Sequence, residues 1–278
     1  MNLSNLLVSF ATFFYVAALC SYFLELSRDD QKEFSWGSLL IEVGFLIHTF
    51  HIFAQTFSKV HNGSDTFFLP VGSFAENANF FAWSLAFVYF SFVKRNTTEG
   101  FGLILSPLLL LFMIPSFFPS QPIAFNLPST GTNYFYLHIL SAFFGYASFA
   151  LSFAAGVLYL AEDRVLKRKS QIHFYHKLVP LEALERFVFR TMFWGLVLLG
   201  MAIVTGSLWM KSAFQSYWTT DPKSLAAILT WGFYLTLVWL HEISAMKGKR
   251  VILISVWAFA LVLFTFIGTS ALKTGIHM

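Results

Sequence analysis

The sequence predicts an all-α, polytopic integral membrane protein with about eight transmembrane helices, and two observations carry this prediction. First, hydrophobic residues make up 57% of the 278 positions, charged residues only 12%, and the mean hydropathy is +0.66. A soluble domain carries about 25% charged residues, so the composition excludes an ordinary soluble fold. Second, the apolar residues gather in separate runs close to the roughly 20 residues that a helix needs to cross a bilayer.

Eight apolar runs are candidates for membrane spans, and the third and fourth are the shortest. The runs cover residues 3–24, 36–57, 78–93, 101–118, 134–161, 191–210, 225–245 and 251–270. No linker, low-complexity tract or soluble domain interrupts them. We therefore expect residues 1–278 to form a single integral-membrane domain.

Basic residues are divided unevenly between the two sets of loops, and this division predicts the orientation. Cytoplasmic loops of membrane proteins are enriched in Lys and Arg. Placing both termini outside leaves four basic residues outside, Lys59, Lys211, Lys223 and Lys273. It places 14 inside: Arg28, Lys32, Lys94, Arg95, Arg164, Lys167, Arg168, Lys169, Lys177, Arg186, Arg190, Lys247, Lys249 and Arg250. The isoelectric point of about 9.1 follows from this topology and does not indicate nucleic-acid binding.

Two connections between spans have a distinctive composition. Residues 58–77, on the outer side, contain an apolar stretch with Pro70 and Gly72, which predicts an interfacial or re-entrant segment. Over residues 181–190, on the inner side, apolar residues recur at helical spacing with charges between them. This pattern predicts an interfacial amphipathic helix that leads into the sixth span.

Residues 206–222 are the most informative segment, and we expect them to form a short external loop rich in aromatic side chains. Clustered aromatic side chains can form a flat surface that stacks against a porphyrin, the ring of heme, and excludes water from it. The candidates for stacking are Trp209, Phe214, Tyr217 and Trp218, and those for pairing with the heme propionates are Lys211 and Lys223. We also expect Asp221 to line the cofactor, and it is placed to cap the helix that Pro222 begins.

Two histidines are predicted to lie on the same outer side as this loop. His138 is near the outer end of the fifth span, and His277 follows the eighth. Ionisable groups in or beside a membrane commonly have a function, and two imidazoles supply both axial nitrogens of one heme. The chain lacks a C-x-x-C-H motif, and its single Cys20 forms no internal disulfide. The expected cofactor is therefore heme b, held by His138 and His277.

Three further histidines lie within spans. His48 and His51, on the second span, share one helix face, and His241 lies near the inner end of the seventh. One interpretation is a second heme site reached from the cytoplasm, formed by His48 and His241, with His51 as the substitute for His48. The alternative is that these imidazoles hydrogen-bond between helices.

Several motifs occur in an order that resembles the CcsA/ResC/HemX group of heme-handling membrane proteins, whose signature is an external tryptophan-rich loop flanked by two histidines. The resemblance covers nearly the whole chain. Its motifs are Pro70, Glu76 and Trp83 in the pattern P-x5-E-x6-W; His138 with Tyr146; Pro180 to Arg186; Gly206-x-x-Trp209; Tyr217-Trp218; Asp221-Pro222-Lys223; Thr230-Trp231; Tyr234; His241; and Gly275-Ile-His277.

The loop departs from the signature W-G-x-x-W-x-W-D-P-K-E of that group at three places. Phe214 and Gln215 stand for the first W-G, Thr220 replaces the last tryptophan, and Ser224 replaces the glutamate. Trp218 and the Asp-Pro-Lys sequence remain. The candidate histidines are all present.

The resemblance implies one of two functions. The first is heme transport to, and presentation at, the outer side of a bacterial cytoplasmic membrane for cytochrome c maturation, with a CcsB/ResB-type partner and apocytochrome c. The chain would then be a subunit of a cytochrome c heme lyase, which leaves open whether it is itself an enzyme. The second is a HemX-like membrane regulator or scaffold of tetrapyrrole synthesis with little bound heme, acting through its basic inner loop.

Overall fold

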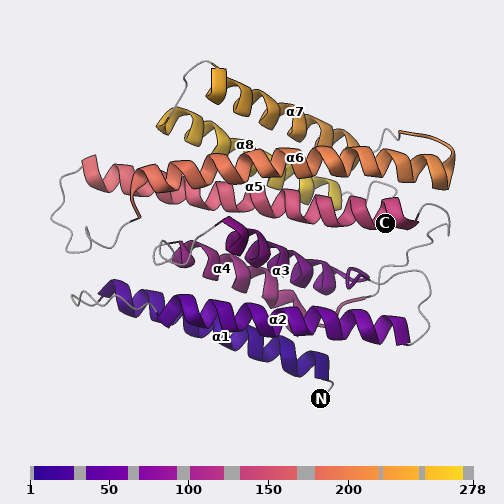
Figure 1. The fold of residues 1–278 in the computed structure, drawn as a ribbon, viewed down its shortest axis with the longest axis horizontal. Coiled ribbons are helices and arrows are strands. Elements are labelled where there is room, and N and C mark those ends of the chain that lie inside the picture. The colour runs from indigo at the N-terminus through magenta and orange to yellow at the C-terminus, as the bar shows by residue number, and fades with distance from the viewer. Residues whose placement is uncertain are drawn as a thin grey trace. The chain divides into compact units, whose positions relative to one another are not determined.

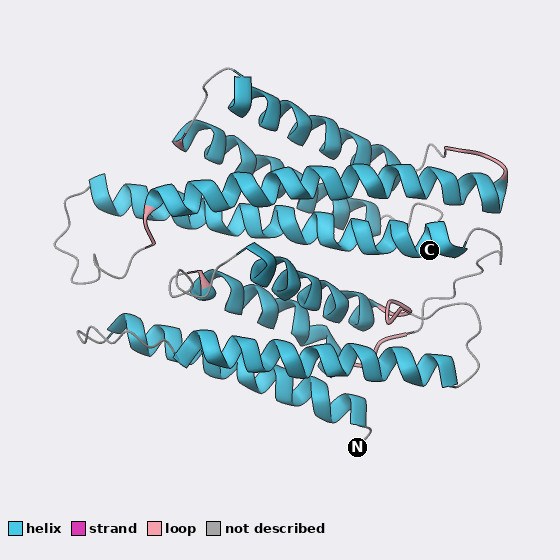
Figure 2. Cartoon of the chain, in the orientation of Figure 1, coloured by secondary structure: helices cyan, strands magenta, loops and turns pink. Residues whose placement is uncertain are grey.

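The structure, a computed structural model, describes residues 3–27, 36–61, 69–92, 101–121, 132–167, 179–218, 222–243 and 248–271, all of them in helices or short connections (Figures 1 and 2). The described residues form eight α-helices and one short 3-10 helix. These are α1 (Leu3–Ser27), α2 (Trp36–His61), α3 (Phe74–Phe92), α4 (Gly102–Met113), η2 (Ile114–Phe117), α5 (Thr132–Lys167), α6 (Leu181–Phe214), α7 (Pro222–Ile243) and α8 (Lys249–Ala271).

Each α-helix overlaps one of the eight predicted spans, and the all-α prediction is confirmed for the described residues. Among the described residues, five helical segments are long and apolar enough to cross a membrane, and together with the composition they make the chain a multi-pass membrane protein. These segments are Leu3–Glu25, Trp36–His61, Asn133–Lys167, Leu181–Phe214 and Ser224–Glu242. The eight crossings and the outward termini stay predictions.

The chain divides into two compact units. The first comprises Met1–Pro122 and Ala161–Ala183, and the second comprises Ile123–Leu160 and Leu184–Met278. The first unit therefore contains α1 to α4, and the second contains most of α5 and α6 together with α7 and α8.

In the first unit, α1 packs along α2 because large side chains on one helix face glycines on the other. A Cβ atom added at Gly44 would lie 2.8 Å from the Tyr15 ring, and one at Gly37 would lie 2.7 Å from the Tyr22 ring. Small residues allow helices in a membrane to approach closely. Tyr15 and Tyr22 are consequently buried although each carries a hydroxyl group.

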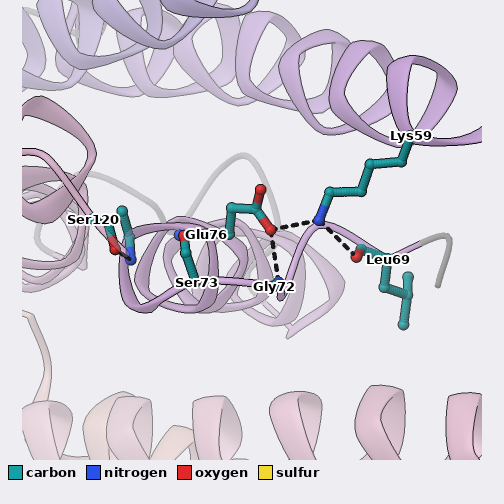
Figure 3. A network of polar contacts seen from close by, with 7 residues as sticks. Lys59, Leu69, Gly72, Ser73, Glu76 and Ser120 are labelled. Carbon is teal, nitrogen blue, oxygen red and sulfur yellow. Dashed lines mark hydrogen bonds and ion pairs between the residues drawn. The ribbon is translucent and has the colours of Figure 1, made fainter. Parts of the chain in front are cut away.

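A polar network fixes the start of α3 against the end of α2 (Figure 3). One carboxylate oxygen of Glu76 accepts hydrogen bonds from the Lys59 ammonium and from the Gly72 backbone N–H, both at 2.6 Å. The Ser73 hydroxyl accepts the Glu76 backbone N–H at 3.1 Å, as an N-cap residue does. The predicted interfacial segment therefore ends in a capped helix start whose carboxylate is paired.

In the second unit, α5 and α6 run antiparallel and meet along a seam with a seven-residue spacing (Figure 1). The Ser152 hydroxyl donates to the Val188 carbonyl at 3.1 Å. One heptad away, a Cβ at Gly145 would lie 3.1 Å from the Leu199 backbone nitrogen, so the two backbones nearly touch there. Such close packing along a heptad is typical of rigid helix pairs.

The helices α7 and α8 complete the second unit. The Trp231 indole N–H donates to the Leu196 carbonyl of α6 at 3.1 Å, and the rings of Phe149 and Tyr234 stack with centroids 3.9 Å apart. The turn before α8 contains Gly248 at φ +73°, whose N–H donates to a Glu185 carboxylate oxygen at 2.8 Å.

One sequence-based boundary around α6 is wrong. Residues 206–214, which the sequence predicts in the external loop, are helical, and α6 ends at Phe214. The helix predicted over residues 181–190 leads into the sixth span as expected, because α6 begins at Leu181 and continues without a break. Leu184, Phe187 and Val188 of this segment are buried in the protein, and its position at a membrane interface stays a prediction.

Candidate functional site

His138 lies on the α5–α6 seam, one heptad from Gly145, and contacts α6 through its ring. Its Nδ1 is 2.8 Å from the Ala202 carbonyl oxygen. A carbonyl oxygen only accepts hydrogen bonds, so Nδ1 carries the proton and Nε2 has the lone pair. Histidines that bind metals commonly donate their other N–H to a backbone carbonyl, which fixes the tautomer and the ring orientation.

Gly206 makes room for this imidazole. A Cβ atom at position 206 would lie 2.7 Å from Nδ1 and 3.0 Å from Cε1 of His138. Glycine inside a helix is about 1 kcal/mol less favourable than alanine, and at position 206, inside α6, it has a packing reason. The ring of His138 occupies the space that a side chain would need.

The aromatic residues of the expected platform lie in two different environments. Trp209 is only 3% exposed and packs between Phe135, with ring centroids 4.8 Å apart, and Phe214, at 5.7 Å. Trp218 is 38% exposed and lies in the connection after α6. Trp209 is thus part of the packed core, whereas the ring of Trp218 is partly exposed.

The last turn of α6 carries a lysine that contacts one of the aromatic rings after the helix. The Lys211 ammonium lies 5.1 Å from the centroid of the Tyr217 ring, within the range of a cation–π contact. Gln215 follows α6 in the left-handed region, at φ +58°. Asp221 and His277 lie outside the described residues, as does the Lys223 side chain.

His48 is fully buried and uses both ring nitrogens. Its Nε2–H donates to the Asn79 side-chain oxygen at 3.0 Å, and its Nδ1 accepts the Tyr15 hydroxyl at 3.2 Å. The Asn79 amide nitrogen is directed at the Ser116 hydroxyl at 3.1 Å, which orients the amide. Iron ligation by His48 would require one of these bonds to break.

His51 is bonded differently. Its Nδ1 lies 3.0 Å from the Ser4 carbonyl oxygen, so this nitrogen carries the proton and Nε2 has the lone pair. This is the tautomer that His138 adopts. The His51 and His48 rings are 6.1 Å apart between centroids, and both belong to the first unit.

His241 belongs to the second unit and stacks on Phe189, with ring centroids 3.5 Å apart and planes within 11°. The two rings border a groove of about 200 Å³ between α6 and α7, which Arg190 and Glu242 also line. Ligand pockets usually enclose about 300–1,000 Å³, so this groove accommodates the edge of a macrocycle at most. His48 and His241 lie in different units, and their pairing stays a prediction.

These side chains fit heme in one respect. The Ala202 carbonyl makes Nδ1 of His138 the donor, so Nε2 of the neutral ring keeps a lone pair of the kind that an axial ligand of heme iron uses. The sequence alone proposed His138 and listed Gly206 among the family motifs, but it gave this glycine no role and did not anticipate the Ala202 carbonyl. The glycine inside an apolar helix was the available signal.

Comparison with known proteins gives the family. A sequence profile described as "Cytochrome C assembly protein" matches residues 72–277, about three quarters of the chain. The chain belongs to the cytochrome c assembly protein family. The matched region includes His138, His241 and His277 and begins after His48 and His51.

Individual relatives agree with this assignment. The chain is 24% identical over 238 residues to a cytochrome c biogenesis protein CcsA of Prochlorococcus marinus subsp. pastoris, covering 75% of this chain and 74% of the relative. It is 23% identical over 248 residues to a CcsA of Heterosigma akashiwo, covering 76% of each. It is therefore a CcsA-like cytochrome c biogenesis protein.

A solved structure has a similar fold. The cytochrome c heme lyase CcmF superposes with a TM-score of 0.67 at 17% identity, over 96% of this chain. The chain spans 45% of the length of CcmF. The similarity is one of fold.

Proposed function

We propose that this chain holds heme b at its outer end and presents it for attachment to apocytochrome c, together with a CcsB/ResB-type membrane protein in a bacterial cytoplasmic membrane. The observation that carries the proposal is the geometry of His138, whose Nδ1–H donates to the Ala202 carbonyl and leaves Nε2 for iron. Membership of the cytochrome c assembly family supports it.

Each residue near the outer end has a distinct part in this function. His138 and His277 would ligate the iron, and Trp218, which is partly exposed, would cover one part of the ring. Trp209 packs against Phe135, which is three residues before His138 on α5. Asp221 lies next to the platform in the sequence. The heme supplies the reactive vinyl groups and the iron, and the protein supplies orientation and exclusion of water.

The test is the absorption spectrum of the protein purified in detergent, compared among single variants. Wild type is expected to carry low-spin heme, because two imidazoles ligate the iron. His138→Ala and His277→Ala are expected to lower heme content or convert the spectrum to high spin, with added imidazole restoring the low-spin form. Trp218→Ala is expected to weaken retention with less change of spin state.

His61→Ala is the matched control, since His61 is an exposed histidine at the end of α2. It should leave heme content and spectrum unchanged. Heme-free wild type, or outer-histidine variants that match wild type in both heme content and spectrum, would show that this outer site does not exist.

For delivery from the cytoplasm, we propose an inner site formed by His241 with a histidine of α2. His48 is the first α2 candidate and His51 its substitute. Ligation by His48 would break one of its two hydrogen bonds, whereas His51 bonds the Ser4 carbonyl, close to the N-terminus that is expected outside and therefore far from the inner end of α7. His241→Ala and His48→Ala should reduce the amount of heme that reaches the outer site without changing its spin state. A larger effect of His51→Ala would identify His51 as the ligand instead.

A second function, that of a HemX-like regulator with little heme, is favoured by one observation: only Trp218 and the Asp-Pro-Lys sequence of the loop signature remain. In that case neutralising Arg164, Arg168 and Arg186 should abolish the cellular phenotype while the histidine variants behave normally. Arg164 and Arg186 are exposed, so these changes spare the core.

A further inference from the structure

We infer that Gly206 is a positioning residue for His138: α6 forms a seat, made by the Ala202 carbonyl and the vacant side-chain position of Gly206, that orients the imidazole toward its ligand. This inference rests on the proposed function for the identity of the ligand. The seat itself is a property of the helix pair.

The first step is the spacing along the seam. His138, Gly145 and Ser152 follow one another at intervals of seven residues on α5, and each contacts α6. Two of these contacts are hydrogen bonds from an α5 side chain to an α6 carbonyl, Ser152 to Val188 and His138 to Ala202. The ring therefore lies at the end of a row that holds the two backbones in register.

The second step is the absence of space at position 206. The Cβ of an alanine would lie 2.7 Å from Nδ1, the nitrogen that bonds the Ala202 carbonyl at 2.8 Å. The ring would have to shift by several tenths of an ångström, and the hydrogen bond would break or lengthen. Functional side chains need to be held within about 0.5 Å of their productive geometry. Gly206 thus controls where Nε2 points.

The third step separates this role from general packing. Gly232 on α7 has no atom within 4 Å of an added Cβ, so Gly232→Ala is a matched control in the same unit. Alanine at either site improves helix propensity by about 1 kcal/mol. A difference between the two variants therefore reports the contact with His138.

The experiment is a double-mutant cycle between Gly206→Ala and His138→Ala, with two readouts on the full-length protein in detergent. The first readout is heme binding by titration with hemin. Gly206→Ala is expected to weaken heme binding roughly tenfold, as loss of a hydrogen bond to a ligating histidine does. It is also expected to shift the spectrum toward high spin, and added imidazole should restore the low-spin spectrum. In the His138→Ala background, Gly206→Ala should have no further effect. Gly232→Ala should bind as wild type.

The second readout is the midpoint of thermal unfolding without heme. Gly206→Ala should lower the Tm of the parent and raise it in the His138→Ala background, because removing the ring removes the overlap and leaves only the gain in helix propensity. A Gly206→Ala variant with unchanged heme affinity and spectrum, or one that lowers Tm equally in both backgrounds, would overturn the seat. If wild type binds no hemin, the proposed function fails while the thermal cycle still decides whether the seat exists.

Discussion

His138, His51 and His48 differ in which ring nitrogen donates a hydrogen bond and in whether the other ring nitrogen is also bonded. His138 and His51 donate Nδ1–H to a backbone carbonyl, whereas His48 donates Nε2–H to Asn79 and accepts from Tyr15. A backbone carbonyl fixes a tautomer without needing a particular side chain. The His48 network instead resembles the interhelical hydrogen bonding that the sequence left open as an alternative to ligation.

Gln215 offers a direct test of local geometry at the end of α6. It lies at φ +58°, where a residue with a Cβ is disfavoured by about 1–2 kcal/mol and where glycine commonly ends a helix. We expect Gln215→Gly to stabilise the protein by roughly 0.5–1 kcal/mol, since the entropic cost of glycine offsets part of the relief. Thermal unfolding in detergent measures this.

The control for that change is Gln215→Ala, which retains the Cβ and should bring no gain. A higher Tm for both variants would place the effect in the Gln215 side chain rather than in the backbone. The glycine is also the residue that the loop signature has at this position, so Gln215→Gly restores the sequence and the geometry together.

At the scale of the elements, apolar periodicity and length predicted each helix, and the boundaries were less accurate. The loop expected at 206–222 is helical up to Phe214 because Trp209 packs against Phe135 of α5 and so extends the apolar face of α6. That contact joins residues far apart in the sequence. A local pattern contains no information about it, and the same holds for the bond between His138 and Ala202, which are 64 positions apart.

The start of α8 depends on two residues that lie 63 positions apart in the sequence. Gly248 adopts φ +73°, and its N–H is held by Glu185 at 2.8 Å. Gly248→Ala is expected to destabilise the protein by about 1–2 kcal/mol, because L-residues are disfavoured in the left-handed region. The expected result is a lower Tm, with Gly232→Ala, which adds the same methyl group in open space, as the control.

A second variant at this turn separates backbone strain from hydrogen bonding. Glu185→Gln keeps an acceptor oxygen for the Gly248 N–H, and should cost less than Gly248→Ala. If Gly248→Ala unfolds at the wild-type temperature, the left-handed turn is not present in the folded protein.

For the whole molecule, the division of basic residues predicts both termini outside, and labelling of single cysteines tests it. The parent is Cys20→Ser, which removes the chain's one cysteine. With this parent, Tyr217→Cys should react with a membrane-impermeant maleimide in intact cells, and Arg168→Cys only after permeabilisation. The reversed pattern would place His138 and His277 on the cytoplasmic side and would remove both proposed heme sites together with the topology.

The sequence predicted the class of protein better than it predicted which side chains of different helices lie together. The 57% hydrophobic composition and the ordered motifs led to a membrane protein of the cytochrome c assembly family. A histidine pair such as His48 and His241 depends on how two compact units meet, which no periodicity in either unit specifies. The outer site draws on features within one unit, the aromatic residues around the end of α6 and His138, and heme binding there stays a prediction.

The close fit between Gly206 and His138 has a consequence for how this family diverges. Because a methyl group at position 206 and an imidazole at position 138 need the same volume, the two positions are not free to vary independently over evolutionary time. A homologue with a side chain at position 206 is expected to lack the histidine at position 138. Replacement of the glycine is therefore expected in homologues that no longer bind heme. Covariation of this pair across relatives would then separate lineages that handle heme from those that retain only the scaffold.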